Sequence, residues 1–132
     1  MRSRLSEHKR QWRDYQTESG ARPIKEFLMA LPDEDRAAIL AEMEYVREHG
    51  TSVARHLRQD IYEVRAMYNT KAYRILFACE GHFHHILLAL DGFQKKTRQT
   101  PKSHIKVAEQ RLADWRRRGK AKRADRESDR RG

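Results

Sequence analysis

Residues 61–96 decide the fold, and they read IYEVRAMYNTKAYRILFACEGHFHHILLALDGFQKK. Runs of β-branched and aromatic residues predict three consecutive strands in this stretch, with a two-residue turn at Asn69-Thr70 between the first two. Facing residues on one side of this hairpin are all apolar, and we expect them to line the core. They are Tyr62 with Phe77, Val64 with Ile75, and Ala66 with Tyr73.

The other side of the same hairpin carries charge where a strand pair normally avoids it. The turn sets Arg65 directly opposite Arg74, with Glu63 two residues away on the same face. Like charges opposed across a strand pair destabilise a sheet by about 0.2–1 kcal/mol, so the two guanidinium groups predict that an anion binds between them. We interpret that anion as phosphate.

The remaining segments predict an α+β fold with the element order β-α-α-β-β-β-α. Residues 11–17 form a short N-terminal strand, residues 23–31 and 33–49 form two amphipathic helices, and Pro101 begins a last helix. Residues 50–60 are expected to be a loop. We expect a three-stranded antiparallel hairpin sheet plus that short strand, with the helices packed on one face.

A second tight turn is predicted at Glu80-Gly81, where it joins the second and third strands. That turn would pair Ile75 with Ile86 and Tyr73 with Leu88. The middle strand is then paired along both of its edges.

Length and charge predict one domain with a basic tail. A chain of 132 residues suits a single hydrophobic core, which we place in residues 10–118, after a flexible leader over residues 1–9. Residues 119–132 have no apolar side chain larger than alanine and are expected to be disordered. The 29 Lys and Arg against 19 Asp and Glu give a net charge of +10, which favours a polyanionic partner such as nucleic acid.

The single cysteine and the lack of a long apolar run indicate a cytoplasmic protein. Cys79 has no second cysteine with which to form a disulfide. The longest aliphatic run, Ile86 to Leu90, is far too short to cross a bilayer, and the N-terminal residues are not typical of a secretion signal. We therefore expect no membrane partner.

Five short motifs follow one another along the chain. They are Glu18-Ser19-Gly20 with Pro23-Ile24-Lys25-Glu26-Phe27-Leu28, Tyr62-Glu63-Val64-Arg65, Tyr73-Arg74-Ile75-Leu76-Phe77, Gly92-Phe93-Gln94-Lys95-Lys96-Thr97, and Thr100-Pro101 ahead of a helix. In this order they resemble the phage-derived, HigB-like branch of the RelE/ParE toxin superfamily. The resemblance covers roughly residues 10–118, and the Gly-Phe-x-Lys-Lys-Thr element is its most specific part.

The resemblance implies the toxin of a type II toxin–antitoxin system. Such a toxin is an endoribonuclease that cleaves mRNA, often at the ribosome, and needs no metal or other cofactor. Its expected partner is a HigA-like antitoxin that carries a helix-turn-helix. In the reaction the RNA 2′-OH attacks the adjacent phosphate while cations stabilise the charge that develops.

The candidate catalytic residues are Arg65, Arg74, Glu63 and Lys95. Arg65 and Arg74 form the phosphate clamp, and Glu63 is the only carboxylate well placed to act as a general base. A lysine whose pKa is lowered by neighbouring cations is the other candidate acid or base. The predicted RNA-binding and phosphate-binding residues are Lys71, Lys96, Arg98 and Tyr68.

The histidines are expected to have no catalytic or metal-binding role. His82, His84 and His85 invite a metal site, but adjacent side chains on a strand point to opposite faces, so at most two of the three converge. His104 begins the last helix and is expected to be polar surface.

Other interpretations remain open. Arg65 and Arg74 are also compatible with surface arginines whose side chains cover the sheet and whose charged ends lie in water or pair with Glu63 or with a helix carboxylate. A ParE-like member of the same superfamily would inhibit DNA gyrase by protein–protein contact and would not need the arginine clamp. A non-enzymatic, basic nucleic-acid-binding module is the third class, although no helix is basic along one face in the way that a recognition helix is.

Overall fold

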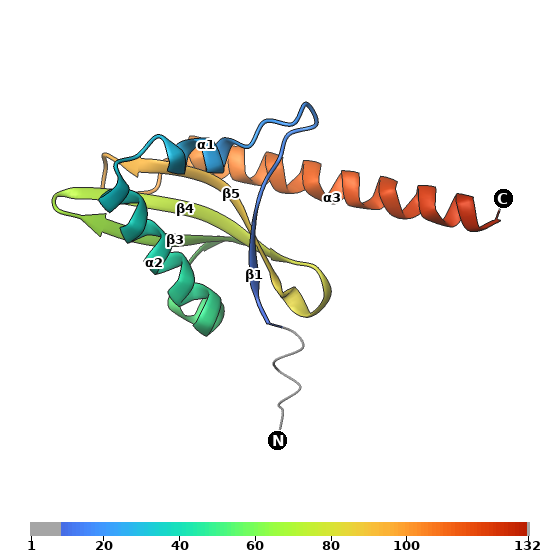
Figure 1. Ribbon diagram of the computed structural model, residues 1–132, viewed down its shortest axis with the longest axis horizontal. Coiled ribbons are helices and arrows are strands. Elements are labelled where there is room, and N and C mark those ends of the chain that lie inside the picture. Colours follow the sequence, from blue (N-terminus) through green and yellow to red (C-terminus); the bar gives the residue numbers. More distant parts are fainter. Residues whose placement is uncertain (1–8, 132) are drawn as a thin grey trace, which may run out of the picture.

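Five strands form a single mixed sheet in the computed structural model, which describes residues 9–131 (Figure 1). In chain order the strands are β1 Gln11–Asp14, β2 Arg55–Arg58, β3 Ile61–Tyr68, β4 Lys71–Glu80 and β5 Ile86–Lys95. Their order across the sheet is β1-β5-β4-β3-β2. The short strand β1 is parallel to β5, and every other neighbouring pair is antiparallel.

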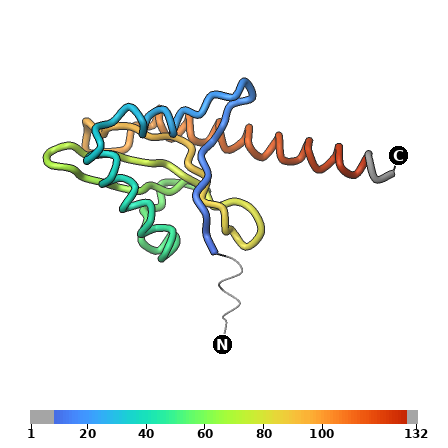
Figure 2. Tube along the Cα trace, viewed as in Figure 1, coloured from blue at the N-terminus to red at the C-terminus, as the bar shows by residue number. Residues whose placement is uncertain are grey.

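Helices cover both faces of this sheet. Helices α1 (Pro23–Met29) and α2 (Asp33–His49) lie in front of the sheet in Figure 1, and α3 (Lys102–Arg131) lies behind it and projects beyond the sheet. The chain trace in Figure 2 shows the same three layers. Two 3₁₀ segments, Gly50–Val53 and His82–His84, complete the fold. We call the two sides of the sheet the α1/α2 face and the α3 face.

The α1/α2 face holds an apolar core, because side chains alternate between the two faces of the strands as the sequence predicts. Ile24 from α1 and Ile39 from α2 are at most 1% exposed, and they are packed in one core with Tyr73, Ile75 and Phe77 of β4. On the α3 face, Ala108 and Leu112 bring the last helix onto the sheet. Both faces of the central strands are therefore buried over part of their length.

The predicted β3–β4 hairpin is confirmed residue by residue. Tyr68 pairs with Lys71 across a two-residue turn, and Asn69 supplies the positive φ of 53° that such a turn requires. The pairs Tyr62 with Phe77, Val64 with Ile75 and Ala66 with Tyr73 share one face, and Arg65 faces Arg74 on the other.

The predicted fold class is correct, but the element order and the layers were wrong in two respects. The stretch expected to be a loop contains β2, so the sheet has five strands rather than a three-stranded hairpin with one addition. Strand β2 has only four residues, and Leu57 is its single apolar side chain, so it gives no alternation signal. The helices also do not share one face, because α3 packs on the side opposite α1 and α2.

The predicted register of β4 with β5 was also wrong. The strands are joined by residues 81–85 instead of a two-residue turn, so Ile75 pairs with Gly92 and Tyr73 pairs with Gln94. A bulge between Leu76 and Phe77 shifts the register by one further residue. The sequence hid this because the apolar run that opens β5 is buried on both faces and has no polar residue to mark an outward position.

The ends of the chain differ from the expectation at the C-terminus. Helix α3 continues to Arg131, through residues that composition alone predicts to be disordered. Residues 1–8 of the predicted leader lie outside the described residues, and Lys9 is exposed. No helix within residues 9–131 has both the length and the apolar character needed to cross a membrane.

Candidate functional site

The α3 face of the sheet carries a cluster of charged side chains that β2, β3, β4 and β5 bring together. Pairing across the sheet places Arg55, Glu63, Leu76 and Asp91 in one row, and Arg65, Arg74 and Phe93 in the next. Lys95 follows Phe93 on the same face, opposite Ala72. We call the group formed by Arg55, Glu63, Arg65, Arg74 and Lys95 the cation cluster.

A carboxylate of the protein itself lies against both arginines. The Glu63 side chain is fully buried, and its Oε1 lies 3.1 Å from Arg65 Nε and 3.5 Å from Arg74 Nε. Thr100, in the loop before α3, donates a hydrogen bond to the other carboxylate oxygen. Both arginines therefore pair with Glu63, although Arg74 is buried and is not a surface arginine, and the binding of phosphate between them stays a prediction.

The two arginines differ in exposure and therefore in what they offer a ligand. Arg65 is 48% exposed, whereas Arg74 is 7% exposed and donates from Nη1 to the backbone oxygen of Tyr73 at 2.8 Å. Burial lowers the pKa of the Arg74 guanidinium and Glu63 opposes this, while Arg65 and Arg55 lower it further. Arg74 Nε is buried without a hydrogen bond within the described chain.

Lys95 has the altered pKa expected of a candidate acid or base. Loss of hydration lowers the pKa of its ammonium group, and the neighbouring charges of Arg74 and Arg65 lower it further. The cluster therefore contains one ammonium that releases its proton more easily than a surface lysine does.

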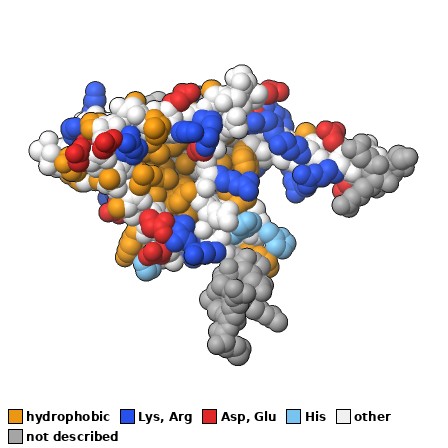
Figure 3. Space-filling view, in the orientation of Figure 1, with side chains coloured by type: hydrophobic (Ala, Val, Ile, Leu, Met, Phe, Trp, Pro, Cys, Tyr) orange, Lys and Arg blue, Asp and Glu red, His pale blue; other side chains and the backbone are white. Residues whose placement is uncertain are grey.

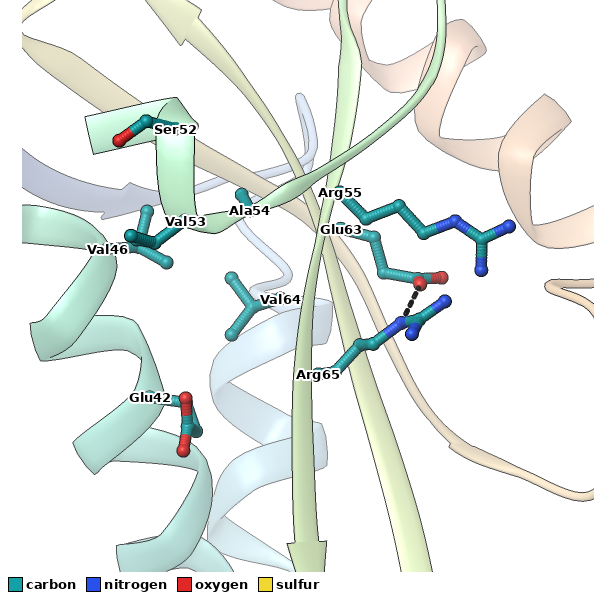
Figure 4. Close-up of a pocket in the computed structure, with 9 residues that line it drawn as sticks. All are labelled: Glu42, Val46, Ser52, Val53, Ala54, Arg55, Glu63, Val64 and Arg65. Atoms are coloured by element: carbon teal, nitrogen blue, oxygen red, sulfur yellow. Dashed lines mark hydrogen bonds and ion pairs between the residues drawn. The ribbon is translucent and has the colours of Figure 1, made fainter. Parts of the chain in front are cut away.

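A pocket of about 680 Å³ lies at the sheet edge beside the cluster. Arg55, Glu63 and Arg65 point to one side of β3, whereas Val46, Val53 and Val64 line the other side (Figure 4). Arg55 faces Glu63 across the β2–β3 pair, and the sequence analysis missed it because it did not predict β2. The only available signal was a basic residue shortly before the predicted strands.

Not all predicted phosphate-binding residues reach this site. Lys71 and Tyr68 alternate onto the α1/α2 face, where the Lys71 ammonium lies 3.0 Å from Asp35. Lys96 and Arg98 are exposed in the segment that follows β5. The structure thus brings together Arg65, Arg74, Glu63 and Lys95 and places Lys71 and Tyr68 on the opposite face of the sheet.

The histidines lie in two places. His82, His84 and His85 are in the connection between β4 and β5, and no group of three or more potential metal ligands occurs among the described side chains. His104 is not simple polar surface, since its ring stacks on Phe93 at 3.7 Å and its Nδ1 lies 2.6 Å from Asp91 Oδ2.

The chain belongs to a recognised family of proteins. The chain belongs to the phage-derived Gp49-like family (DUF891), whose model matches residues 26–113 and so includes the whole cluster. It is 33% identical over 110 residues to "Probable endoribonuclease HigB1" of Mycobacterium tuberculosis strain CDC 1551 / Oshkosh, covering 80% of this chain and 85% of the relative. The same figures hold for the protein of that name in strain ATCC 25618 / H37Rv.

These matches agree with the resemblance carried by the motifs at the level of the family. Placement in the wider RelE/ParE superfamily stays a prediction, as do the roles of individual residues.

Proposed function

We propose that this protein is the toxin of a toxin–antitoxin pair and acts as a metal-independent endoribonuclease on mRNA. The observation that carries the proposal is the charge of the cation cluster, in which four cations surround one buried carboxylate on an open part of the sheet. The relatives called HigB1 are named as endoribonucleases, which supports the same chemistry.

The cluster supplies what cleavage by the RNA 2′-OH needs. The exposed guanidinium of Arg65, together with Arg55, holds the non-bridging oxygens of the phosphate and stays charged at any working pH. As the 2′-oxygen attacks, negative charge grows on the phosphate, and cations that are already in place stabilise it. No metal is required, because guanidinium and ammonium groups provide the positive charge.

Glu63 acts in this proposal by holding the cations and not as the general base. Its carboxylate is buried against two arginines and Thr100, so a substrate hydroxyl has no direct access to it. Lys95 has a lowered pKa and is the better candidate for proton exchange with the 2′-OH.

The experiment that tests the proposal is induction of the full chain in a bacterial host, with growth and transcripts followed together. We expect growth arrest and cut transcripts that end in 2′,3′-cyclic phosphates. Arg65→Ala should lower the cleavage rate of the purified protein about 10²- to 10³-fold, since it removes one stabilising cation. Arg13→Ala, which removes another exposed strand arginine, is the matched control and should cleave like the parent.

Two outcomes would contradict the proposal. Intact transcripts together with inhibited DNA supercoiling would favour the gyrase-inhibitor interpretation. An Arg65→Ala protein that cleaves at the parent rate would remove the cluster from the mechanism.

The partner of the proposed toxin is a cognate antitoxin, with a helix-turn-helix domain and an acidic, partly apolar segment. The positive charge of the cation cluster favours such a segment. We expect co-expression to abolish toxicity and to protect Arg65 from modification by phenylglyoxal. An inactive complex in which Arg65 reacts as in the free protein would show that inhibition occurs elsewhere.

A further inference from the structure

His104 is held at one ring nitrogen and is open at the other. It is the third residue of α3, and its ring lies nearly parallel to Phe93, with an interplanar angle of 11°. Nδ1 lies 2.6 Å from Asp91 Oδ2. Because an ionised carboxylate only accepts, Nδ1 carries the proton in this contact, and Nε2 is the nitrogen that can exchange a proton.

Nothing within residues 9–131 forms a hydrogen bond with His104 Nε2, and about a third of the side chain, 35%, is exposed. Asp91 is itself nearly buried, with 13% of its side chain exposed, and its other oxygen accepts from the backbone of Gly92 at 3.0 Å. Asp91, which orients the imidazole, is therefore itself held in place by the backbone of Gly92. This is the arrangement by which a carboxylate orients a histidine for proton transfer.

His104 stands beside the cation cluster. Phe93, on which it stacks, pairs directly with Arg74, and Arg74 pairs with Arg65. The imidazole and the exposed guanidinium thus lie over strands two positions apart, which is about 10 Å between strand axes. The imidazole and the two arginines therefore lie on the same face of the sheet.

We propose that His104 is the general acid of the reaction, protonating the 5′-oxygen that leaves, and that Asp91 positions it. The proposal rests on the proposed ribonuclease function and deepens it by assigning one proton. The 2′-oxygen forms a bond to phosphorus, and its proton passes to the general base, for which Lys95 is the candidate. The bond from phosphorus to the 5′-oxygen breaks, its electron pair stays on that oxygen, and the proton at His104 Nε2 is transferred to it.

The charged groups near His104 come from β4, β5 and α3. Asp91 of β5 contacts Nδ1, and Arg111 of α3 lies 3.5 Å from the other oxygen of Asp91. Arg74 of β4 pairs with Phe93, on which His104 stacks, and Lys95 follows Phe93 on the same strand face. After cleavage, neutral His104 regains a proton from solvent.

A purely structural role for His104 makes a different prediction. Anchoring the start of α3 requires the stacking and the contact with Asp91 but has no use for Nε2. Asparagine places its amide nitrogen near the position of histidine Nδ1, so His104→Asn keeps the contact with Asp91 but removes both the distal nitrogen and the ring that stacks on Phe93. Loss of the stacking slows cleavage whether or not the leaving group needs a proton, whereas loss of the proton donor slows it only where a proton is needed. His84→Asn, at an exposed histidine in the β4–β5 connection, is the matched control.

The test is single-turnover cleavage of a synthetic RNA, free and on programmed ribosomes, with either oxygen or sulfur as the 5′ bridging atom. Sulfur leaves as a thiolate and needs no proton. We expect His104→Asn to slow cleavage at oxygen about 10²- to 10⁴-fold and to cleave at sulfur at nearly the parent rate. Asp91→Asn should show the same pattern with a smaller loss, and His84→Asn should match the parent.

Parent activity on the oxygen substrate comes first, because its absence would overturn the proposed function and this inference with it. If the parent cleaves, a His104→Asn protein that is equally slow on both substrates, or as fast as the parent on oxygen, overturns the general-acid role alone. If the variant does not fold, the parent protein alone provides the test. The fall in its cleavage rate at high pH should be present with the oxygen substrate and absent with the sulfur substrate, and an unchanged pH–rate profile contradicts the inference.

Discussion

The two faces of the same strands handle charge in opposite ways. On the α1/α2 face, buried Asp35 receives hydrogen bonds from Tyr73 and from Lys71, so one cation meets one carboxylate. On the α3 face, Glu63 is the single buried carboxylate of a cluster that contains four cations. The first arrangement is complete within the protein, whereas the second leaves positive charge for a ligand.

In the proposed function, this difference lets one sheet serve both stability and RNA binding. Strand alternation sends successive side chains to opposite faces, so residues 73 and 74 take part in different networks although they are neighbours in sequence. Further positive charge lies along the projecting part of α3 (Figure 3), but there it is spread along a helix and not gathered around a carboxylate. The two faces therefore differ in how far their cations are matched by carboxylates.

The largest expected effect comes from removing Glu63, the one carboxylate of the cation cluster. Glu63→Ala leaves Arg74 buried without its partner, and breaking a buried ion pair in this way costs about 3–5 kcal/mol in the free energy of unfolding. Urea unfolding of the purified protein measures it. Glu109→Ala breaks only the half-exposed pair with Arg58 and should cost less than about 1 kcal/mol.

If Glu63→Ala is as stable as the parent, the carboxylate does not hold the cluster together. The two faces would then differ only in composition and not in how their charges are organised.

A smaller effect is expected from crowding the apolar core on the α1/α2 face at Gly92. A Cβ added at Gly92 would lie 2.7 Å from Phe27 Cδ2 and 3.0 Å from Ile75 Cδ1, so Gly92→Ala forces α1 away from the sheet. Overpacking of this kind costs about 1–3 kcal/mol and should lower the melting temperature. Gly119→Ala is the control, because nothing lies within 4 Å of that position and the substitution favours the helix. Equal stability of the two variants would show that α1 adjusts freely.

The smallest effect concerns how the free energy of unfolding depends on pH through the contacts of Asp35 with Tyr73 and Lys71. The hydrogen bond from Tyr73, followed by Lys71, lowers the pKa of Asp35 below its ordinary value of 3.8, and burial with Asp35 raises the pKa of Tyr73 to about 12. A carboxyl whose pKa is lowered by folding stabilises the protein above its unfolded pKa, and that stabilisation is lost as the pH falls.

We therefore expect Asp35→Asn to lower the free energy of unfolding at pH 7 and to have a progressively smaller effect as the pH falls below about 4. Urea titrations at pH 7 and below about pH 4 measure the two effects. Asp33→Asn, at a carboxylate 90% exposed in the same helical turn, should show no comparable dependence. A destabilisation by Asp35→Asn that is the same at both pH values would mean that the charge of Asp35 contributes nothing.

Local pattern was enough to predict much of the fold. The β3–β4 register followed from Asn69-Thr70, since a two-residue turn leaves one possible pairing, and that register brought Arg65 opposite Arg74. The two helices between the strands followed from apolar spacing and from Pro23 and Gly50 at their ends. These features depend on residues close together in the chain, so no tertiary information was needed.

The rest of the site depends on contacts between distant segments. Arg55 enters it only because β2 pairs with β3, and Thr100 and His104 enter only because the loop after β5 returns over the α3 face. Lys71, predicted to bind phosphate, and His104, predicted to be polar surface, are each paired with a carboxylate from another element. Sequence spacing does not reveal such partners.

By itself the sequence determined the alternation of the strands, and with it the fact that two arginines face each other on the side away from the apolar core. Only the tertiary structure decided which anion they meet, because the burial of Glu63, the pairing of β2 and the path of α3 are long-range outcomes of packing. Short-range order comes from backbone geometry, which neighbouring residues set, whereas the charge balance of a site is a sum over segments that meet only after folding.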